Sequence, residues 1–334
     1  MTTIIHTQQP PHAVVWTLAN AVVASRCLQI AAELGVADHV DAHPVSAADL
    51  AARCGADTDA LERALQLLAA HGVFEATDGG FRHTPASALL RSDHPMSMRA
   101  FPRMMGLPLF TQTFAQLEHS VETGSPAVAR IAPGGLWEYL EQHPAEAQVF
   151  GEAMTAKALA DIAAILDAYD FGVFRTIADV AGGRGHLLRA VLEASPGATG
   201  VLFDLPPVID ALDFVHERMT AQAGDFFADP LPRADAYVLM DVIHDWPDDE
   251  CVAILKAIRQ AAAPGATVLV IENVLAEDGL DAHGRTLDVI MLAVTGGRER
   301  TPVQLNRLFE RAGFSDGIVT ETASPLRVVE ATAV

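Results

Sequence analysis

Cysteine is scarce in this sequence. Its 334 residues include only Cys27, Cys54 and Cys251, which lie far apart and form no CxxC pair. This spacing argues against a disulfide framework and against a structural zinc site. So few cysteines are typical of a protein in a reducing compartment, and we expect a cytoplasmic location.

Basic residues are also few. There are 22 Lys and Arg against 43 Asp and Glu, which gives a net charge of -21 and a pI near 4.8. Nucleic acid and anionic membranes would both be repelled by such a chain. We therefore expect no nucleic acid and no membrane among its partners, and a neutral or apolar small molecule as substrate.

The sequence also shows no pattern of a targeting signal. The start of the chain has neither the basic region nor the apolar core of a signal peptide. The longest apolar stretch, about Ala13 to Ala24, ends before Arg26 and is too short to span a bilayer. We expect this stretch to form a buried or interface helix.

The first hundred residues have the pattern of a winged-helix module. Ala13–Val40 has apolar residues at helical spacing, with Gly35 as a break, and Ser46 begins a second helix in a capping-box pattern. A third helix is predicted over Thr58–His71. A hairpin is predicted because the short runs Val73–Phe74 and Phe81–Arg82 flank a turn at Asp78–Gly80.

A winged helix suggests a DNA-binding regulator as one possible function. Between Ser46 and His71 the sequence has four acidic and two basic residues. A recognition helix with this balance would be repelled by phosphate. We therefore favour a packing role for the region, as a dimer interface.

From Thr176 onward, apolar runs alternate with helical stretches, which predicts an α/β fold with a doubly wound, mostly parallel sheet. The apolar runs are Thr176–Val180, Gly200–Phe203, Ala236–Met240 and Thr267–Ile271. A closing antiparallel hairpin is predicted from Ile318–Thr322 and Leu326–Ala331. We divide the chain into a dimerisation domain (1–100), a helical linker with pocket residues (101–172) and a catalytic domain (173–334).

Ligands of open α/β sheets bind beyond the carboxyl ends of the strands, so the residues that follow each strand identify the site. Each of five predicted strand ends is followed by a group that suits a ligand, namely Gly182–Gly183, Asp204, Asp225–Phe226, His244 and Glu272. Taken singly, the glycines could simply form a turn and Asp225 could be an ordinary turn residue. All five together favour a binding site.

These motifs, in order, resemble the plant-type small-molecule O-methyltransferases, whose bacterial members tailor aromatic metabolites. The resemblance rests on Asp179–Gly183, Val201–Pro206, Gly224–Phe227, His244–Trp246 and Gly296–Thr301. It covers nearly the whole chain. It implies a Rossmann-like catalytic domain, an N-terminal winged-helix-like dimerisation domain and a homodimer.

The resemblance also assigns roles to the cofactor residues. S-adenosylmethionine is the implied cofactor, with Gly182 and Gly183 against its methionine part. Asp204, next to Leu205, would hold the ribose hydroxyls. Asp225 and Phe226 would hold the adenine. Met240 stands where a Lys or Arg often contacts the cofactor, and Ala181 replaces a frequent glycine.

The remaining roles concern catalysis and the substrate. The family pattern makes His244 the general base, flanked by Glu272 and Glu299, and it requires no metal. The implied substrate-binding residues are Phe150, Met154, Asp245, Met291 and Thr295. For Phe150, Met154 and Met291, core packing is an equal alternative.

Chemistry supports a base at position 244. A phenol has a pKa of about 10, so a proton acceptor must create the nucleophile at neutral pH. A neighbouring carboxylate, either Glu272 or Glu299, would orient the imidazole. Glu299 has a competing role, because it precedes the capping box Thr301–Gln304 and could favour that helix N-terminus.

Two alternatives remain besides the winged-helix regulator. Some family members bind S-adenosylmethionine yet catalyse hydroxylation or other non-methylating reactions. A nicotinamide-dependent oxidoreductase would have a similar sheet, but the chain lacks GxGxxG. We predict methylation of a hydroxyl on a small aromatic molecule.

Overall fold

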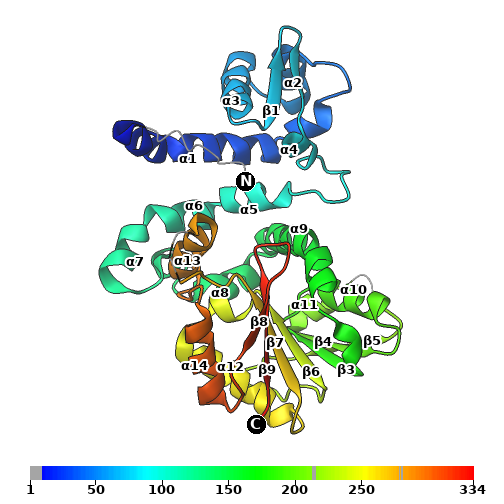
Figure 1. Ribbon diagram of the computed structural model, residues 1–334. Helices are drawn as coiled ribbons and strands as arrows, with labels where there is room; N and C mark the ends of the chain where they lie inside the picture. Colours follow the sequence, from blue (N-terminus) through cyan, green and yellow to red (C-terminus); the bar gives the residue numbers. More distant parts are fainter. Residues whose placement is uncertain (1–9, 213–215, 278, 280) are drawn as a thin grey trace, which may run out of the picture. The chain divides into compact units, whose positions relative to one another are not determined.

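The computed structural model describes residues 10–212, 216–277, 279 and 281–334. The chain forms two compact units, Met1–Leu107 and Pro108–Val334, which we describe separately. Figure 1 shows the first unit from blue to cyan and the second from blue-green to red.

The first unit is a set of helices with one two-stranded hairpin. Its elements are α1 (Pro11–Glu33), η1 (Val36–His39), α2 (Ala47–Cys54), α3 (Thr58–Ala70), β1 (Phe74–Thr77), β2 (Gly80–His83), α4 (Pro85–Ala88) and α5 (Ala100–Gly106). Leu61, Leu65 and Leu68 of α3 are all buried, as their spacing predicts. The Ser46 hydroxyl caps α2 by accepting from the Asp49 N–H at 3.1 Å. The predicted helices and hairpin of this region are thus confirmed.

Helix α1 differs from the expectation. It continues past Arg26 and has 23 residues, so the prediction that this apolar segment is too short to span a bilayer is wrong. By length and composition alone, α1 is long and apolar enough to cross a membrane. Only Ala31 and Ala32 of this helix are buried. Large apolar side chains remain exposed along it, namely Val14, Val15, Trp16, Leu18, Val22, Val23 and Ile30.

The second unit contains a seven-stranded sheet in the order β5-β4-β3-β6-β7-β9-β8. Its strands are β3 (Thr176–Val180), β4 (Thr199–Asp204), β5 (Met219–Ala223), β6 (Ala236–Met240), β7 (Thr267–Glu272), β8 (Ile318–Thr320) and β9 (Arg327–Thr332). The first five are parallel, and β9 runs antiparallel to β7 and β8. This confirms the predicted fold class and closing hairpin.

Strand β5 was not among the predicted apolar runs. Its sequence, Met219–Ala223, has a single buried residue, Met219, and its other side chains are partly or fully exposed. It lies at the edge of the sheet, where fewer side chains need to be apolar. Hydrophobic patterning therefore gave no signal for it.

The helices of the second unit are α6 (Pro108–Ala115), α7 (Leu117–Thr123), η2 (Ala127–Arg130), α8 (Gly135–Gln142), α9 (Pro144–Ala168), η3 (Phe171–Val173), α10 (His186–Ala194), α11 (Pro206–Asp210), η4 (Ile243–Asp245), α12 (Asp248–Ala261), α13 (Ala282–Val294) and α14 (Pro302–Ala312). Of these, α9 and α10 cover one face of the sheet, and α12 and α14 cover the other (Figure 1).

Strand alternation assigns neighbouring residues to the two faces. Tyr237 and Leu239 of β6 pack with α12 and α14, whereas Ala236 and Val238 pack with α9 and α10. Apolar side chains on both faces explain why β6 and β7 are almost continuously apolar. The polar groups are therefore concentrated at the strand ends.

Strands β3 and β6 are neighbours in the sheet, and the chain order reverses between them. Asp179 pairs with Val238, so the loops after β3 and β6 start side by side. Such a switch point is where an open α/β sheet binds its ligand. The site described next lies at this edge.

Candidate active site

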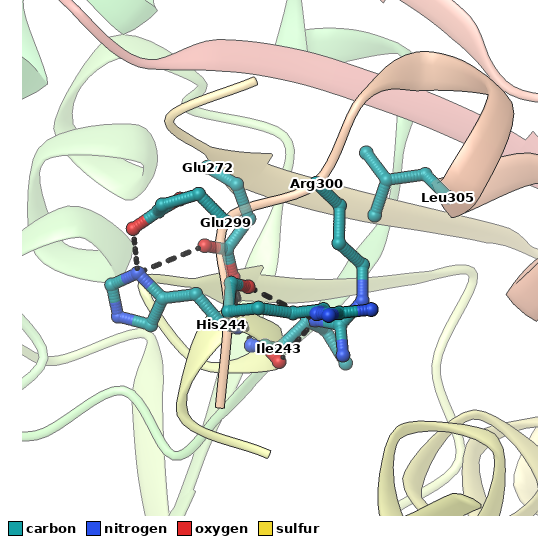
Figure 2. Close-up of a pocket in the computed structure, with 7 residues that line it drawn as sticks. Ile243, His244, Glu272, Glu299, Arg300 and Leu305 are labelled. Atoms are coloured by element: carbon teal, nitrogen blue, oxygen red, sulfur yellow. Dashed lines mark hydrogen bonds and ion pairs between the residues drawn. The ribbon is translucent and has the colours of Figure 1, made fainter. Parts of the chain in front are cut away.

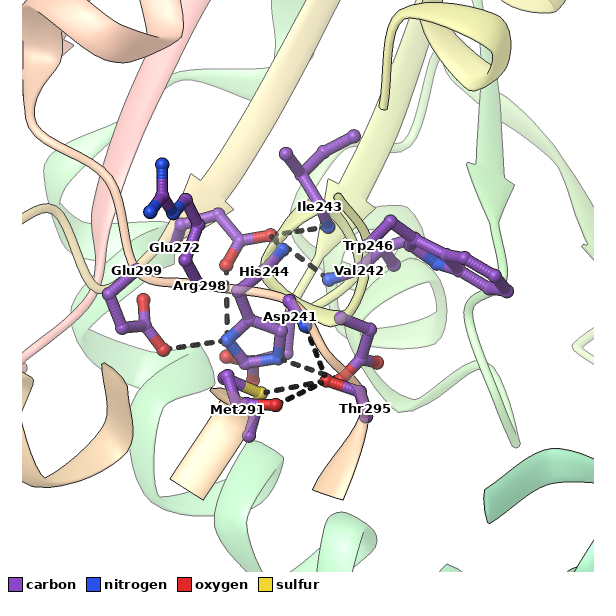
Figure 3. Close-up of polar contacts among 12 residues, drawn as sticks. Asp241, Val242, Ile243, His244, Trp246, Glu272, Met291, Thr295, Arg298 and Glu299 are labelled. Carbon is purple, nitrogen blue, oxygen red and sulfur yellow. Dashed lines mark hydrogen bonds and ion pairs between the residues drawn. The ribbon is translucent and has the colours of Figure 1, made fainter. Parts of the chain in front are cut away.

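The turn after β6 carries His244. This short 3-10 turn, η4, is held by Glu272 at the end of β7. One carboxylate oxygen, Oε1, accepts from the N–H groups of Val242 at 3.0 Å, Ile243 at 2.8 Å and His244 at 3.4 Å. Glu272 therefore fixes the backbone of the turn and, through it, the position of the imidazole (Figure 3).

The His244 ring lies between carboxylates (Figures 2 and 3). Its Nδ1 is 2.9 Å from Glu299 Oε1 and 3.4 Å from Glu272 Oε2. An ionised carboxylate can only accept, so Nδ1 carries the hydrogen and donates to Glu299. The neutral imidazole then presents Nε2 as its proton acceptor, with Asp245 Oδ1 3.8 Å away.

This acidic surrounding controls the charge of the cluster. Burial acts to lower the pKa of His244, but Glu272, Asp245 and Glu299 outweigh it and raise the pKa well above 6.5. Burial raises the pKa of Glu272 to about 7 and that of Asp245 to about 6, although His244 opposes both shifts. Near neutral pH, protons are thus shared within the cluster.

The segment Gly296–Arg300 packs directly on the catalytic turn. The Arg298 N–H donates to the His244 carbonyl at 2.8 Å. A Cβ on Gly297 would lie 1.9 Å from the same carbonyl, so only glycine permits this approach. Because the segment is held here, Glu299 reaches the imidazole.

Arg300 supports the turn from the other side (Figure 2). Its buried guanidinium donates to the carbonyls of Ile243 at 2.9 Å and Trp246 at 2.8 Å, and to Asp248 Oδ1 at 2.8 Å. The capping box of α14 is formed by Thr301 and Gln304. The Glu299 side chain is fully buried against His244, which favours a role with the imidazole over a role at the helix N-terminus.

The loop after β3 has the shape of a cofactor cradle. Gly183 has φ +60°, and a Cβ on Gly182 would lie 2.4 Å from the Asp179 carboxylate. The Gly183 N–H donates to Asp204 Oδ2 at 2.8 Å, and the Leu205 N–H donates to Asp204 Oδ1 at 2.7 Å. Asp204 is thereby oriented at the end of β4 with lone pairs left for ligand hydroxyls.

Asp179 gives a further test of fit. Its carboxylate is buried, and neither oxygen has a hydrogen-bond partner among the described residues. Burial, with Asp204 nearby, raises its pKa to about 7. An unpaired buried acceptor beside a glycine cradle suits a ligand that brings donors, as S-adenosylmethionine does. The residues present therefore fit this cofactor.

An aromatic group follows β5. Phe226 and Phe227 pack edge to face at 4.7 Å between ring centroids, and Phe227 lies 4.8 Å from Trp246. Asp225 precedes them, and its Oδ1 accepts from the Phe227 N–H at 2.8 Å. This arrangement provides apolar faces next to a carboxylate. Met240, at the end of β6, is half-buried and offers no charge.

The predicted substrate residues come from α9, α13 and η4. Phe150 packs on Trp137 at 5.9 Å between centroids, and Met154 is half-buried one turn along α9. At the end of α13, the Thr295 hydroxyl donates to the Met291 carbonyl at 3.0 Å (Figure 3). None of these side chains is fully buried, which fits a pocket wall better than a closed core. Asp245 lies beside His244, as its sequence position requires.

Asp241, His244 and Glu272 have ligand-type atoms within 4.8 Å of one another, so the trio could hold a metal ion by spacing. All three groups already have partners, and those of Glu272 are the backbone N–H groups of the turn. Glu299 takes His244 Nδ1, and the Lys157 ammonium lies 2.5 Å from Asp241 Oδ2. This favours a proton-sharing cluster, and the expectation of no metal remains a prediction.

Four residues of this region were missed as site residues: Lys157, Asp179, Asp241 and Arg300. Asp179 and Arg300 stood inside recognised motifs, and Asp241 directly follows β6, where a search of strand ends would find it. Lys157 is distant in sequence and gave no signal. Only folding brings it to Asp241.

Sequence comparison identifies both parts of the chain. Residues 114–315 match the O-methyltransferase domain, and residues 16–93 match the O-methyltransferase dimerisation domain. The chain belongs to the O-methyltransferase family. This confirms the predicted family, its enzymatic class and its S-adenosylmethionine cofactor.

Individual relatives agree with this family assignment. The methyltransferase is 38% identical over 314 residues to the phenazine O-methyltransferase of Lysobacter antibioticus, with 92% of each chain covered. Human N-acetylserotonin methyltransferase, solved with S-adenosylmethionine, superimposes with a TM-score of 0.91 at 28% identity, covering 100% and 99% of the two chains. An O-methyltransferase from neocarzinostatin biosynthesis, solved with S-adenosylmethionine and 2-hydroxy-5-methyl naphthoic acid, has a TM-score of 0.78 at 33% identity, covering 93% and 96%.

Proposed function

We propose that the methyltransferase methylates a phenolic hydroxyl of a small aromatic metabolite, with His244 as the general base. The observation that carries this proposal is the His244–Glu299 contact of 2.9 Å, with Glu272 at 3.4 Å. It leaves Nε2 as the proton acceptor of a neutral imidazole. The phenazine and naphthoic acid in the names of two relatives support an aromatic substrate.

S-adenosylmethionine, when bound, supplies an electrophilic methyl group on a sulfonium. The chain supplies the nucleophile: His244 Nε2 accepts the phenol proton as the oxygen becomes electron-rich. Glu299 accepts from Nδ1–H and stabilises the imidazolium that forms. Glu272 and Arg300 hold the turn, so the imidazole loses little entropy in reaching its working geometry.

The raised pKa of His244 determines the pH dependence of the reaction. A base acts only when it is deprotonated, so the rate rises with pH through the pKa of the cluster. Because the carboxylates raise the pKa of His244 well above 6.5, we expect the acidic limb of kcat/KM above that value. Maximal activity is therefore expected at mildly alkaline pH.

The variant His244→Ala tests the proposal. We expect turnover to fall roughly 100-fold or more, the usual scale for a general base, while the Kd for S-adenosylhomocysteine stays unchanged. Mass spectrometry of a phenolic acceptor measures the gain of one methyl group, and calorimetry measures cofactor binding. His71→Ala, an exposed histidine of the N-terminal unit, is the matched control. Wild-type turnover in His244→Ala would exclude this base, and a gain of oxygen would exclude methyl transfer.

The methyltransferase is further proposed to act as a cytoplasmic homodimer joined through its N-terminal unit. Exposed Trp16, Leu18 and Val22 on α1 support this, since such a surface suits a protein interface in a dimerisation domain. Leu18→Asp combined with Val22→Asp places charges on that surface. Light scattering should then report a monomer, whereas a persistent dimer would place the interface elsewhere.

A further inference from the structure

The ion pair between Lys157 and Asp241 has no role in the proton transfer described above. Lys157 Nζ, from α9, lies 2.5 Å from Asp241 Oδ2, directly after β6. Lys157 is one of only two lysines in the chain. The side chains are 21% and 18% exposed, so both groups are desolvated and still within reach of a ligand.

The pair lies at the switch point of the sheet. Asp179 of β3 pairs with Val238 of β6, and Gly182 and Asp241 follow these residues at equal spacing. Asp241 therefore starts the loop next to the glycine cradle. Its carboxylate also lies within 4.8 Å of a His244 ring nitrogen. Asp241 thus lies close to the proposed base, in the loop that neighbours the cradle.

Backbone strain marks the same place. Ala181 and Asp241 are the two non-glycine residues with positive φ in the described part of the chain, at 56° and 54°. They directly follow the neighbouring strands β3 and β6. A left-handed non-glycine residue costs free energy and is concentrated at functional sites. In this conformation the Asp241 carboxylate contacts Lys157.

Both groups carry charge. Burial lowers the pKa of Lys157, but Asp241, together with Asp161 and Glu272, outweighs burial, and the pKa ends above its ordinary range. Burial raises the pKa of Asp241, but Lys157 and His244 outweigh it and the pKa ends below its ordinary range. Asp241 Oδ1 still lacks a donor among the described residues. The pair thus offers one cation and one incompletely satisfied anion.

We propose that Lys157 and Asp241 bind the amino-acid end of S-adenosylmethionine, with Lys157 on its α-carboxylate and Asp241 on its α-ammonium. The methionyl group is a zwitterion, and two opposite charges side by side are complementary to it. Gly182 and Gly183, which are expected to contact the methionine part, start the loop next to Asp241, so the methionyl group would meet the pair there. The inference rests on S-adenosylmethionine being the methyl donor.

A series of uncharged and charged ligands tests this assignment with the full-length wild-type protein. S-adenosylhomocysteine has both charged groups, its decarboxylated analogue keeps only the ammonium, and 5′-methylthioadenosine has neither. A charged hydrogen bond contributes enough for about 10- to 100-fold in Kd. Calorimetry should show a loss of affinity of this size twice, first when the carboxylate is removed and again when the ammonium is removed. Equal affinity for the first two ligands would overturn the role of Lys157.

Variants then assign each step to a residue. Lys157→Met should abolish the preference for S-adenosylhomocysteine over its decarboxylated analogue and leave methylthioadenosine binding unchanged, and Lys157→Arg should restore part of it. Asp241→Asn should instead abolish the preference for the decarboxylated analogue over methylthioadenosine. Lys256→Met, at the exposed second lysine on α12, is the matched control.

A structural role predicts a different pattern. If Lys157→Met weakens all three ligands by the same factor, the pair only supports the fold and the proposal is overturned. If either single variant fails to fold, the neutral pair Lys157→Met with Asp241→Asn replaces it and should bind all three ligands alike. A protein that passes these binding tests but methylates no phenol would refute the proposed reaction alone.

Discussion

Replacing Glu299 by Gln separates the charge of this residue from its shape. Gln has nearly the same size, and its amide oxygen can still accept from His244 Nδ1–H at the 2.9 Å position. The tautomer of the imidazole is therefore kept. Only the negative charge next to it is lost.

The structure sets the size of the effect. A hydrogen bond to a charged group contributes about 1.5–3 kcal/mol, and the Glu299 side chain is fully buried, so solvent screens it little. This corresponds to roughly 1–2 units in the pKa of His244 and about 10- to 100-fold in the stability of the imidazolium. Glu272 remains at 3.4 Å and keeps the loss within this range.

The assay is a pH–rate profile at saturating S-adenosylmethionine. We expect the acidic limb of Glu299→Gln to move to lower pH by about 1–2 units, because the imidazole now loses its proton more easily. The plateau rate should fall about 10- to 100-fold, because the imidazolium formed during the reaction is less stable. Glu310→Gln, at an exposed position of α14, is the control. A plateau that falls while the limb stays in place would refute the reasoning, since the charge would then not act on His244.

Three further predictions concern the cofactor side of the site. Sinefungin carries a cationic group at the methyl-donor position, and a nearby cation disfavours an imidazolium. NMR should therefore find a lower pKa for His244 in the complex with sinefungin than in the complex with S-adenosylhomocysteine. Equal pKa values would place the imidazole far from the methyl-donor position. For Asp179→Asn, the gain in Tm over wild type should grow from pH 5 to pH 8. Burial raises the pKa of Asp179 in the wild type to about 7, so its native state binds a proton that the unfolded chain has already lost, and its stability falls as the pH rises toward 7, by up to roughly 4 kcal/mol. A Tm difference that stays constant with pH would contradict this. Ala181→Gly removes a left-handed alanine and should stabilise the protein by about 0.5–1 kcal/mol in chemical denaturation, whereas a loss of stability would show that φ of 56° carries no strain.

The sequence was informative wherever one local pattern had one physical cause. Leu61, Leu65 and Leu68 predicted a buried helix face, and the apolar runs of β6 and β7 predicted strands covered on both sides. Local patterns failed to predict elements whose side chains are largely exposed. Strand β5 lies at the sheet edge and needed few apolar residues, and α1 continues past Arg26 to Glu33 with large apolar side chains left exposed.

By itself, the sequence determined most of the strands, the residues that follow their carboxyl ends and thus the family, since turns and strand ends are coded by neighbouring residues. Only the tertiary structure decided which of those residues meet. It joined Glu299 to His244 across 55 positions and Lys157 to Asp241 across 84. Such contacts depend on the packing of α9 and of the Gly296–Arg300 segment against the sheet, and no periodicity along the chain records them.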